Sequence, residues 1–138
     1  MNDVMVNLGD RSYAITIQPS GLSNLGQWIE EKALGRHAAI ISDDTVSKLY
    51  SQKAMDALRR SEIRSTLHVV PDGEGSKSFD TVVRLYTQLI EANLRRDGVV
   101  IGLGGGVVND LAGFVAATYL RGVNLVQVPT SLLAQVFA

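Results

Sequence analysis

The chain has 138 residues, of which 46% are hydrophobic and 20% charged, and its formal net charge is −1. These values are typical of a single globular domain and exclude a disordered, collagen-like or coiled-coil protein. There is no excess of positive charge to hold nucleic acid or an anionic membrane, so we expect neither as a partner. Cysteine is absent, which is compatible with a reducing compartment, and we expect a cytoplasmic protein.

Residues 4–8 and 12–18 alternate apolar and polar side chains around Gly9 and Asp10, which predicts a β-hairpin. Apolar residues then recur at helical spacing over 21–33, 44–60, 79–90 and 107–119. Short apolar runs, typical of buried strands, lie between them at 38–42, 63–70, 99–103 and 123–128. Such alternation predicts a Rossmann-like α/β fold: an open, mostly parallel sheet with helices on both faces, preceded by the hairpin.

Two of these helices have apolar positions that we expect to face the core. The helix that begins after Asp43 or Asp44 is predicted to bury Val46, Leu49, Tyr50, Ala54, Ala57 and Leu58. The helix that follows Ser78, its predicted N-cap, is predicted to bury Phe79, Val82, Val83, Tyr86, Leu89 and Ile90.

Ligands of open parallel sheets bind at the carboxyl ends of the strands. The segments that follow the predicted strands are Asp43, the polar loop 71–77, the glycine run 104–106, and Thr130 with Ser131. We therefore expect the functional residues among these four segments, and we expect Thr130 or Ser131 to cap a further helix.

The glycine run 104–106 lies between a strand and a helix, where free N–H groups and the helix dipole suit a pyrophosphate. The alternative is a tight turn without a ligand. The run is neither a Walker A loop nor a G-x-G-x-x-G match, because no Lys-Ser/Thr pair follows it and position 107 is valine. Asp110, one turn into the helix, could cap a backbone donor or reach the ligand.

Asp43 at a strand end could accept hydrogen bonds from ribose hydroxyls, which favours NAD over NADP, or it could cap the next helix. Glu74 and Lys77 could both contact a nucleotide, or they could belong to a solvated turn.

Arg121 lies between a helix and a strand, where it could interact with the helix dipole or clamp a phosphate. His37 and His68 are the only histidines and have no companions at metal-binding spacing. We interpret both as structural or surface residues, so the sequence contains no complete zinc site.

The sequence resembles 3-dehydroquinate synthase over its whole length, most specifically in GGGVVNDLAGFVAATYLRGV at 104–123 and VQVPTSLLAQV at 126–136. The loop DGEGSKS and the opening NLGDRSYAITI add to the resemblance. It implies that residues 1–138 are the NAD-binding N-terminal domain, and that a C-terminal metal and substrate domain is not included in this chain.

The family resemblance also implies roles for individual residues. The implied nucleotide-binding set is Asp43, Glu74, Lys77, Gly105, Gly106, Val107, Asp110, Thr130, Ser131 and Leu133. Arg121 is implied to reach the phosphate of a sugar-phosphate substrate across a homodimer interface.

The implied reaction cyclises 3-deoxy-D-arabino-heptulosonate 7-phosphate to 3-dehydroquinate with loss of phosphate, the second step of the shikimate pathway. NAD is regenerated in this reaction. A zinc or cobalt ion in the second domain, whose ligands are outside this chain, polarises substrate oxygens.

The chain departs from the family pattern at two places. Asn109 stands where the family usually has glycine, a change that a helix tolerates unless close packing requires glycine. Phe137 and Ala138 replace the continuation that holds a substrate-contacting aspartate, so we expect no complete turnover from this chain alone. The alternatives are another sugar-phosphate cyclase, a glycerol-type dehydrogenase, or a nucleotide-binding module without catalysis.

Overall fold

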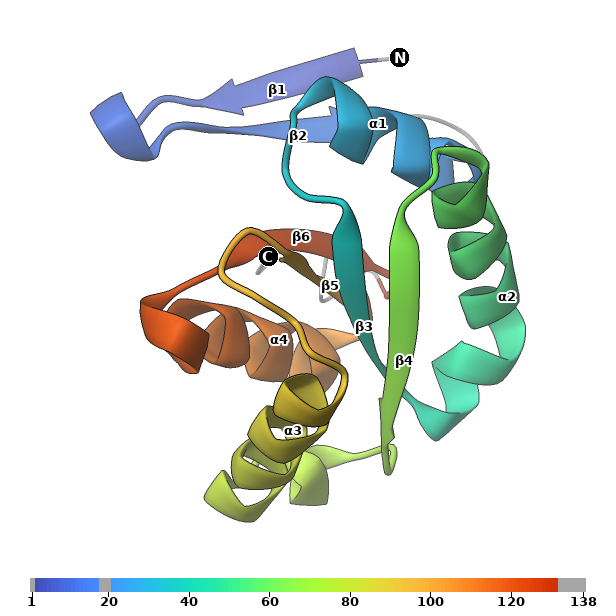
Figure 1. Ribbon diagram of the computed structural model, residues 1–138, viewed down its shortest axis with the longest axis vertical. Helices are drawn as coiled ribbons and strands as arrows, with labels where there is room; N and C mark the ends of the chain where they lie inside the picture. The colour runs from blue at the N-terminus through green and yellow to red at the C-terminus, as the bar shows by residue number, and fades with distance from the viewer. Residues whose placement is uncertain (1, 18–20, 132–138) are drawn as a thin grey trace.

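The computed structural model describes residues 2–17 and 21–131 (Figure 1). Six strands and four α-helices lie in these ranges, in an order that confirms the predicted hairpin and the alternation after it. The elements are β1 (Asn2–Val6), β2 (Tyr13–Ile17), α1 (Leu25–Glu31), β3 (His37–Asp43), α2 (Asp44–Arg60), β4 (Arg64–Val70), α3 (Phe79–Glu91), β5 (Val99–Gly104), α4 (Gly106–Thr118) and β6 (Asn124–Pro129). The helix expected after Thr130 falls outside the described residues.

β3 to β6 form one parallel sheet in the order β4-β3-β5-β6. α1 and α2 cover one face, and α3 and α4 cover the other (Figure 1). Side chains of β3 alternate between the two cores: Ala38 and Ile40 pack with α1 and α2, whereas Ala39 and Ile41 pack with α3 and α4. A strand buried on both faces must be apolar throughout, which explains the unbroken run that the sequence shows there.

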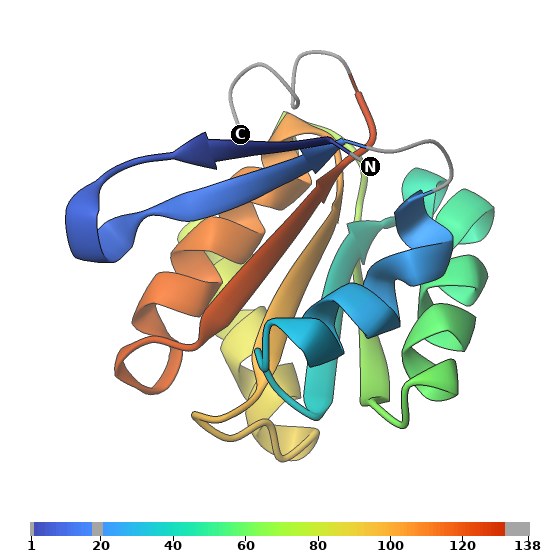
Figure 2. The same cartoon turned by 90° about the horizontal axis from the view of Figure 1, so that it is seen from above.

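The hairpin of β1 and β2 forms a separate two-stranded sheet that projects to one side of this domain (Figure 2). Its register places Val4 opposite Ile15, so these side chains share a face with Tyr13 and Ile17. All four are 43–58% exposed, and neither core, as formed by the described residues, includes a hairpin side chain. The hairpin is therefore held mainly by its own ladder of hydrogen bonds.

The predicted apolar positions of two helices are partly wrong. α3 buries Thr81, Val82, Leu85 and Leu89, whereas Phe79 is 77% exposed and Val83 and Ile90 are also exposed. α2 buries Ser47, Ala54, Ala57 and Leu58 and leaves Leu49 and Tyr50 exposed. The apolar stripe of each helix is wider than the arc that the sheet covers, so its outer residues remain at the surface.

Buried His68 on β4 forms a polar network beneath α3. Its Nδ1–H donates to Gln88 Oε1 over 2.9 Å, and Nε2 accepts from the Thr66 hydroxyl over 2.7 Å. Burial lowers the pKa of His68 below 6.5, although the Gln88 hydrogen bond opposes this shift. The ring is therefore mainly neutral in the folded chain at pH 7, consistent with its predicted structural role.

The free energy of unfolding should fall as the pH drops below about 6.5. As the pH falls through this range, the unfolded chain binds a proton at His68 more readily than the folded chain, so acid favours unfolding. The pKa of His37 is also lowered, first by burial and then by Arg64, and acts in the same direction. Urea titrations between pH 5 and 8 measure the dependence, and His68→Gln should flatten it. If His68→Gln kept the wild-type pH dependence of stability, a group other than His68 would be its cause.

Candidate functional site

The carboxyl ends of β3 and β5 meet at the point where the order of strands reverses. From β3 the chain moves outward to β4, then returns across the sheet to β5 and continues to β6 on the other side. The topological switch point therefore lies between Asp43, at the end of β3, and Gly104, at the end of β5. A crevice for a ligand is expected at this position in an open parallel sheet.

The glycine run leads directly into the amino end of α4. Gly105 is the N-cap residue, and as a glycine it offers no side chain to cap this helix. The N–H groups of Gly106, Val107 and Val108 thus lack intrahelical acceptors, since Asn109 is the first to bond back, to Gly105 O. Apart from its chain neighbours and the backbone of its own helix, a Cβ atom on Gly106 would meet no atom of the described residues within 4 Å. This helix end is open to an anion such as a diphosphate.

Asp43 caps α2, which confirms one of its two predicted roles. Its Oδ1 accepts hydrogen bonds from the backbone N–H of Thr45 and Val46, at 2.9 and 2.7 Å. Its Oδ2 makes no hydrogen bond to any described residue. One oxygen of this nearly buried carboxylate orients the helix and the other remains for a ligand, so the two roles are compatible.

The 71–77 loop is anchored to the start of α2. The Thr45 hydroxyl donates to Asp72 Oδ2 over 3.2 Å, and Asp72 N–H donates to Asp44 Oδ1 over 3.1 Å. Ser76 is buried and its hydroxyl donates to Pro71 O. These contacts fix the loop beside the switch point, with Glu74 exposed at its surface.

Lys77 forms an ion pair with Asp110 rather than with Glu74. Lys77 Nζ lies 2.8 Å from Asp110 Oδ2, and both side chains are about half exposed. The hydrogen bond and charge of Asp110 raise the pKa of Lys77, with a smaller contribution from Glu74. Asp110 therefore does not cap α4, and the pair bridges the 71–77 loop and the second turn of α4.

Two residues after β6 complete the edge. Thr130 N–H donates to Gly104 O over 2.9 Å. A Cβ on Gly105 would lie 3.6 Å from Ser131 Oγ, which places Ser131 beside the glycine run. The structure thus gathers most of the predicted nucleotide-binding residues at one edge, while Leu133 lies outside the described residues.

Arg121 is not part of this edge. It follows α4, whose 13 residues separate it from the glycine run by about 20 Å. Leu120, Arg121 and Gly122 all have positive φ angles, of 49°, 68° and 112°. This left-handed turn presents the exposed Arg121 side chain at the opposite edge of the sheet.

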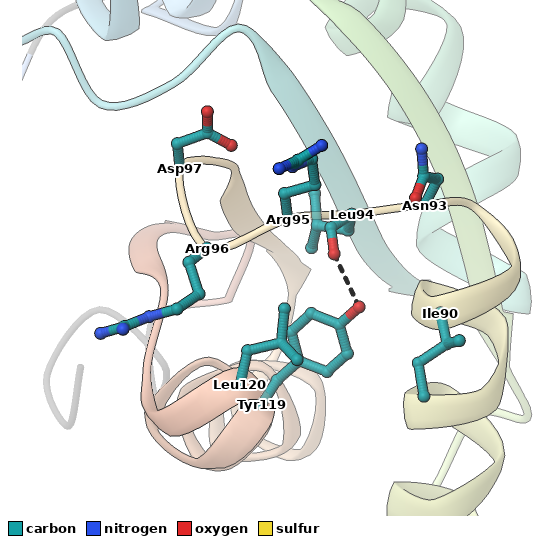
Figure 3. Close-up of a pocket in the computed structure, with 8 residues that line it drawn as sticks. All are labelled: Ile90, Asn93, Leu94, Arg95, Arg96, Asp97, Tyr119 and Leu120. Carbon is teal, nitrogen blue, oxygen red and sulfur yellow. Dashed lines mark hydrogen bonds between the residues drawn. The ribbon is translucent and has the colours of Figure 1, made fainter.

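A hollow lies at that opposite edge, between the end of α3, the 93–97 loop and the turn after α4 (Figure 3). Tyr119 Oη donates to Leu94 O over 2.7 Å across its floor. Arg95 and Arg96 line it beside Asp97. It shares no residue with the nucleotide edge and is separate from the site described above.

Asn109 is a residue whose contacts the sequence did not predict. It is 4% exposed, and its side chain hydrogen-bonds to the glycine run. The sequence does contain a signal for these contacts. Asn109 follows Gly105 by four residues, and a helical side chain at that spacing can donate a hydrogen bond to the earlier residue's carbonyl oxygen.

Within 2–17 and 21–131, no group of three or more His, Cys, Asp or Glu side chains is placed to hold a metal ion. In the same ranges, no helix has the length and apolar character needed to cross a membrane.

A family model described as 3-dehydroquinate synthase N-terminal matches residues 67–138. The curated 3-dehydroquinate synthase of Pelotomaculum thermopropionicum is 48% identical over 136 residues, which cover 99% of this chain and 37% of that protein. The enzyme of the same name from Pelobacter propionicus is 46% identical, and the match covers 38% of its length. The chain therefore spans less than two-fifths of these relatives.

Solved structures share the fold. A 2-deoxy-scyllo-inosose synthase, complexed with carbaglucose-6-phosphate, NAD+ and Co2+, has a TM-score of 0.84 at 24% identity, over 96% of this chain and 36% of that one. A 2-epi-5-epi-valiolone synthase from Streptomyces hygroscopicus, with NAD+ and Zn2+ bound, has a TM-score of 0.76 at 29% identity. The match covers 92% of this chain and 35% of that one.

Proposed function

The chain belongs to the 3-dehydroquinate synthase family, and from this premise we propose that residues 1–138 are the NAD-binding N-terminal domain of such an enzyme. The whole enzyme would convert 3-deoxy-D-arabino-heptulosonate 7-phosphate to 3-dehydroquinate and phosphate, in the shikimate pathway and in the cytoplasm. The observation that carries the proposal is the glycine-lined start of α4 at the switch point, next to Asp43 Oδ2, which accepts no hydrogen bond from a described residue.

The residues at this edge suit a dinucleotide. The N–H groups of Gly105, Gly106 and Val107 would bind the pyrophosphate, and Asp43 Oδ2 would accept from the adenosine ribose. The remaining contacts are assigned to Glu74, Lys77, Asp110, Thr130, Ser131 and Leu133. When bound, NAD supplies reversible hydride transfer. This chain's residues bind the cofactor and orient it toward the substrate.

The metal and most of the substrate are assigned to a second domain. The described residues offer no donor set for zinc or cobalt, so we derive no metal-dependent step from them. Arg121 is proposed to reach the substrate phosphate of the partner in a homodimer. Its position at the edge remote from its own nucleotide site supports this assignment. This chain alone is therefore expected to carry out no complete turnover.

The degree of similarity favours this substrate over those of related cyclases. The curated 3-dehydroquinate synthases are 41–48% identical to the chain, whereas the solved inosose and valiolone synthases are 24–29% identical. A glycerol dehydrogenase from Schizosaccharomyces pombe shares the fold with a TM-score of 0.61. Arg121 would have no phosphate to bind in a dehydrogenase of that type.

Calorimetric titration of NAD+ into the chain, with two variants of Asp43, tests the proposed site. Asp43→Asn keeps an N-cap side chain, so stability should be retained while NAD+ affinity falls about tenfold through loss of the charged acceptor. Asp43→Ala removes both roles and should also lower the free energy of unfolding by about 1 kcal/mol. Wild-type affinity in Asp43→Asn would contradict the ribose contact. A folded chain without NAD+ binding would contradict the nucleotide site itself.

A further inference from the structure

Asn109 connects α4 to the glycine run that precedes it. Its Nδ2 donates to Gly104 O over 2.9 Å and to Gly105 O over 3.0 Å. Each carbonyl has a second donor as well: Thr130 N–H binds Gly104 O, and Asn109's own N–H binds Gly105 O. The two peptide oxygens at the start of the loop are thus held by four hydrogen bonds, two of which come from one buried side chain.

Holding these oxygens fixes the direction of the next two N–H groups. A peptide unit is planar and trans, so its C=O and N–H bonds point in opposite directions. When Gly104 O faces Asn109, the N–H of Gly105 must face away from it, and the same relation connects Gly105 O to the N–H of Gly106. Glycine backbones rotate more freely than those of other residues, and the Asn109 side chain adds to the backbone hydrogen bonds that restrict this rotation.

The other half of the Asn109 amide has no partner. Oδ1 is buried and accepts no hydrogen bond from the described residues. It lies against Gly102, because a Cβ built there would be 2.9 Å from it. A flipped amide would direct Oδ1 at the two loop oxygens, so the orientation is determined. An unsatisfied buried acceptor opposes folding, which argues against a role confined to stability.

We propose that Asn109 is a positioning residue, which acts by directing the N–H groups of Gly105 and Gly106 toward the pyrophosphate of the dinucleotide. The inference rests on the proposed function for the identity of the ligand. The orientation of the loop, by contrast, is a property of the chain without ligand and can be measured separately.

Three substitutions separate positioning from filling space. Asn109→Leu keeps four side-chain heavy atoms branched at Cγ but has no donor, Asn109→Ala lacks both the bulk and the donor, and Asn109→Ser keeps one donor within reach of Gly105 O. NAD+ affinity should fall about tenfold in the alanine and leucine variants and less in the serine variant. The matched control is Gln127→Leu, because Gln127 Nε2 donates to the backbone oxygen of Asn109 and not to the loop. It should bind NAD+ as the wild type does.

If Asn109 only filled space, its substitution would not change the direction of the two N–H bonds in the free chain. That direction is therefore the decisive measurement. Residual dipolar couplings of Gly105 and Gly106 should change in Asn109→Ala and Asn109→Leu, remain closer to wild type in Asn109→Ser, and stay unchanged in Gln127→Leu. Unchanged couplings in folded alanine and leucine variants would overturn the proposal, whatever the affinity. Changed couplings with unchanged affinity would also overturn it. If the wild-type chain binds no NAD+, the proposed function fails, and the couplings still decide whether Asn109 orients the loop.

Discussion

Gly106→Val should weaken NAD+ binding by the chain at least a hundredfold while leaving its thermal unfolding midpoint unchanged. A Cβ at this position meets nothing within 4 Å, and the φ of Gly106 is not in the left-handed region. The free chain therefore accommodates a side chain without strain. A bound pyrophosphate must approach the helix N–H groups through that same space, so the added atoms displace the ligand. Gly106→Ala should give a smaller loss.

Calorimetry and thermal melting of the same samples measure the two effects. The matched control is Gly113→Ala in the same helix, whose Cβ would make an ordinary contact of 3.4 Å with Gln127 Nε2. It should retain NAD+ affinity. Wild-type affinity in Gly106→Val would place the pyrophosphate away from the start of α4.

Gly26→Ala should lower the free energy of unfolding by about 3 kcal/mol, the upper range for overpacking a core. In an isolated helix the same change would be favourable by about 1 kcal/mol. The sign reverses because the new Cβ would lie 2.3 Å from the carbonyl oxygen of Ala57 in α2. Backbone cannot rotate away as a side chain can, so α1 would have to move, together with the buried Leu25 and Ile29.

Urea unfolding measures this loss, and a second substitution tests its cause. Ser61 Oγ lies 2.8 Å from the same Cβ position, so Ser61→Ala in the Gly26→Ala background relieves only the smaller conflict. The double variant should remain destabilised. If it returned to wild-type stability, the conflict with Ala57 would not be the cause.

The sequence was sufficient to predict the order of elements and which segments meet at the carboxyl end of the sheet. Continuous apolar runs are characteristic of strands buried on both faces, and Asp43 and Ser78 were each identified as possible N-caps, which the structure confirms. Once the strands are known to be parallel, their carboxyl ends must share an edge. The grouping of Asp43, the 71–77 loop and the glycine run follows from that rule.

The errors concern contacts that depend on how elements pack. Helical periodicity relates the positions of a helix to one another but does not indicate which arc the sheet covers. Exposed Phe79 illustrates the difference, since it packs against Phe114 of α4 with the rings 6.5 Å apart and nearly perpendicular. The Lys77–Asp110 pair likewise depends on α3 and α4 lying side by side on one face.

The hairpin and the four-stranded domain should open as two separate cooperative units. Amide groups of β3 and β5, between both cores, can exchange with solvent only when the whole domain unfolds. Within 2–17 and 21–131, β1 and β2 contribute no side chain to either core, and a two-stranded hairpin on its own is marginally stable in water. Their amides can therefore exchange through a local opening of much lower free energy, independent of the sheet that carries the nucleotide edge.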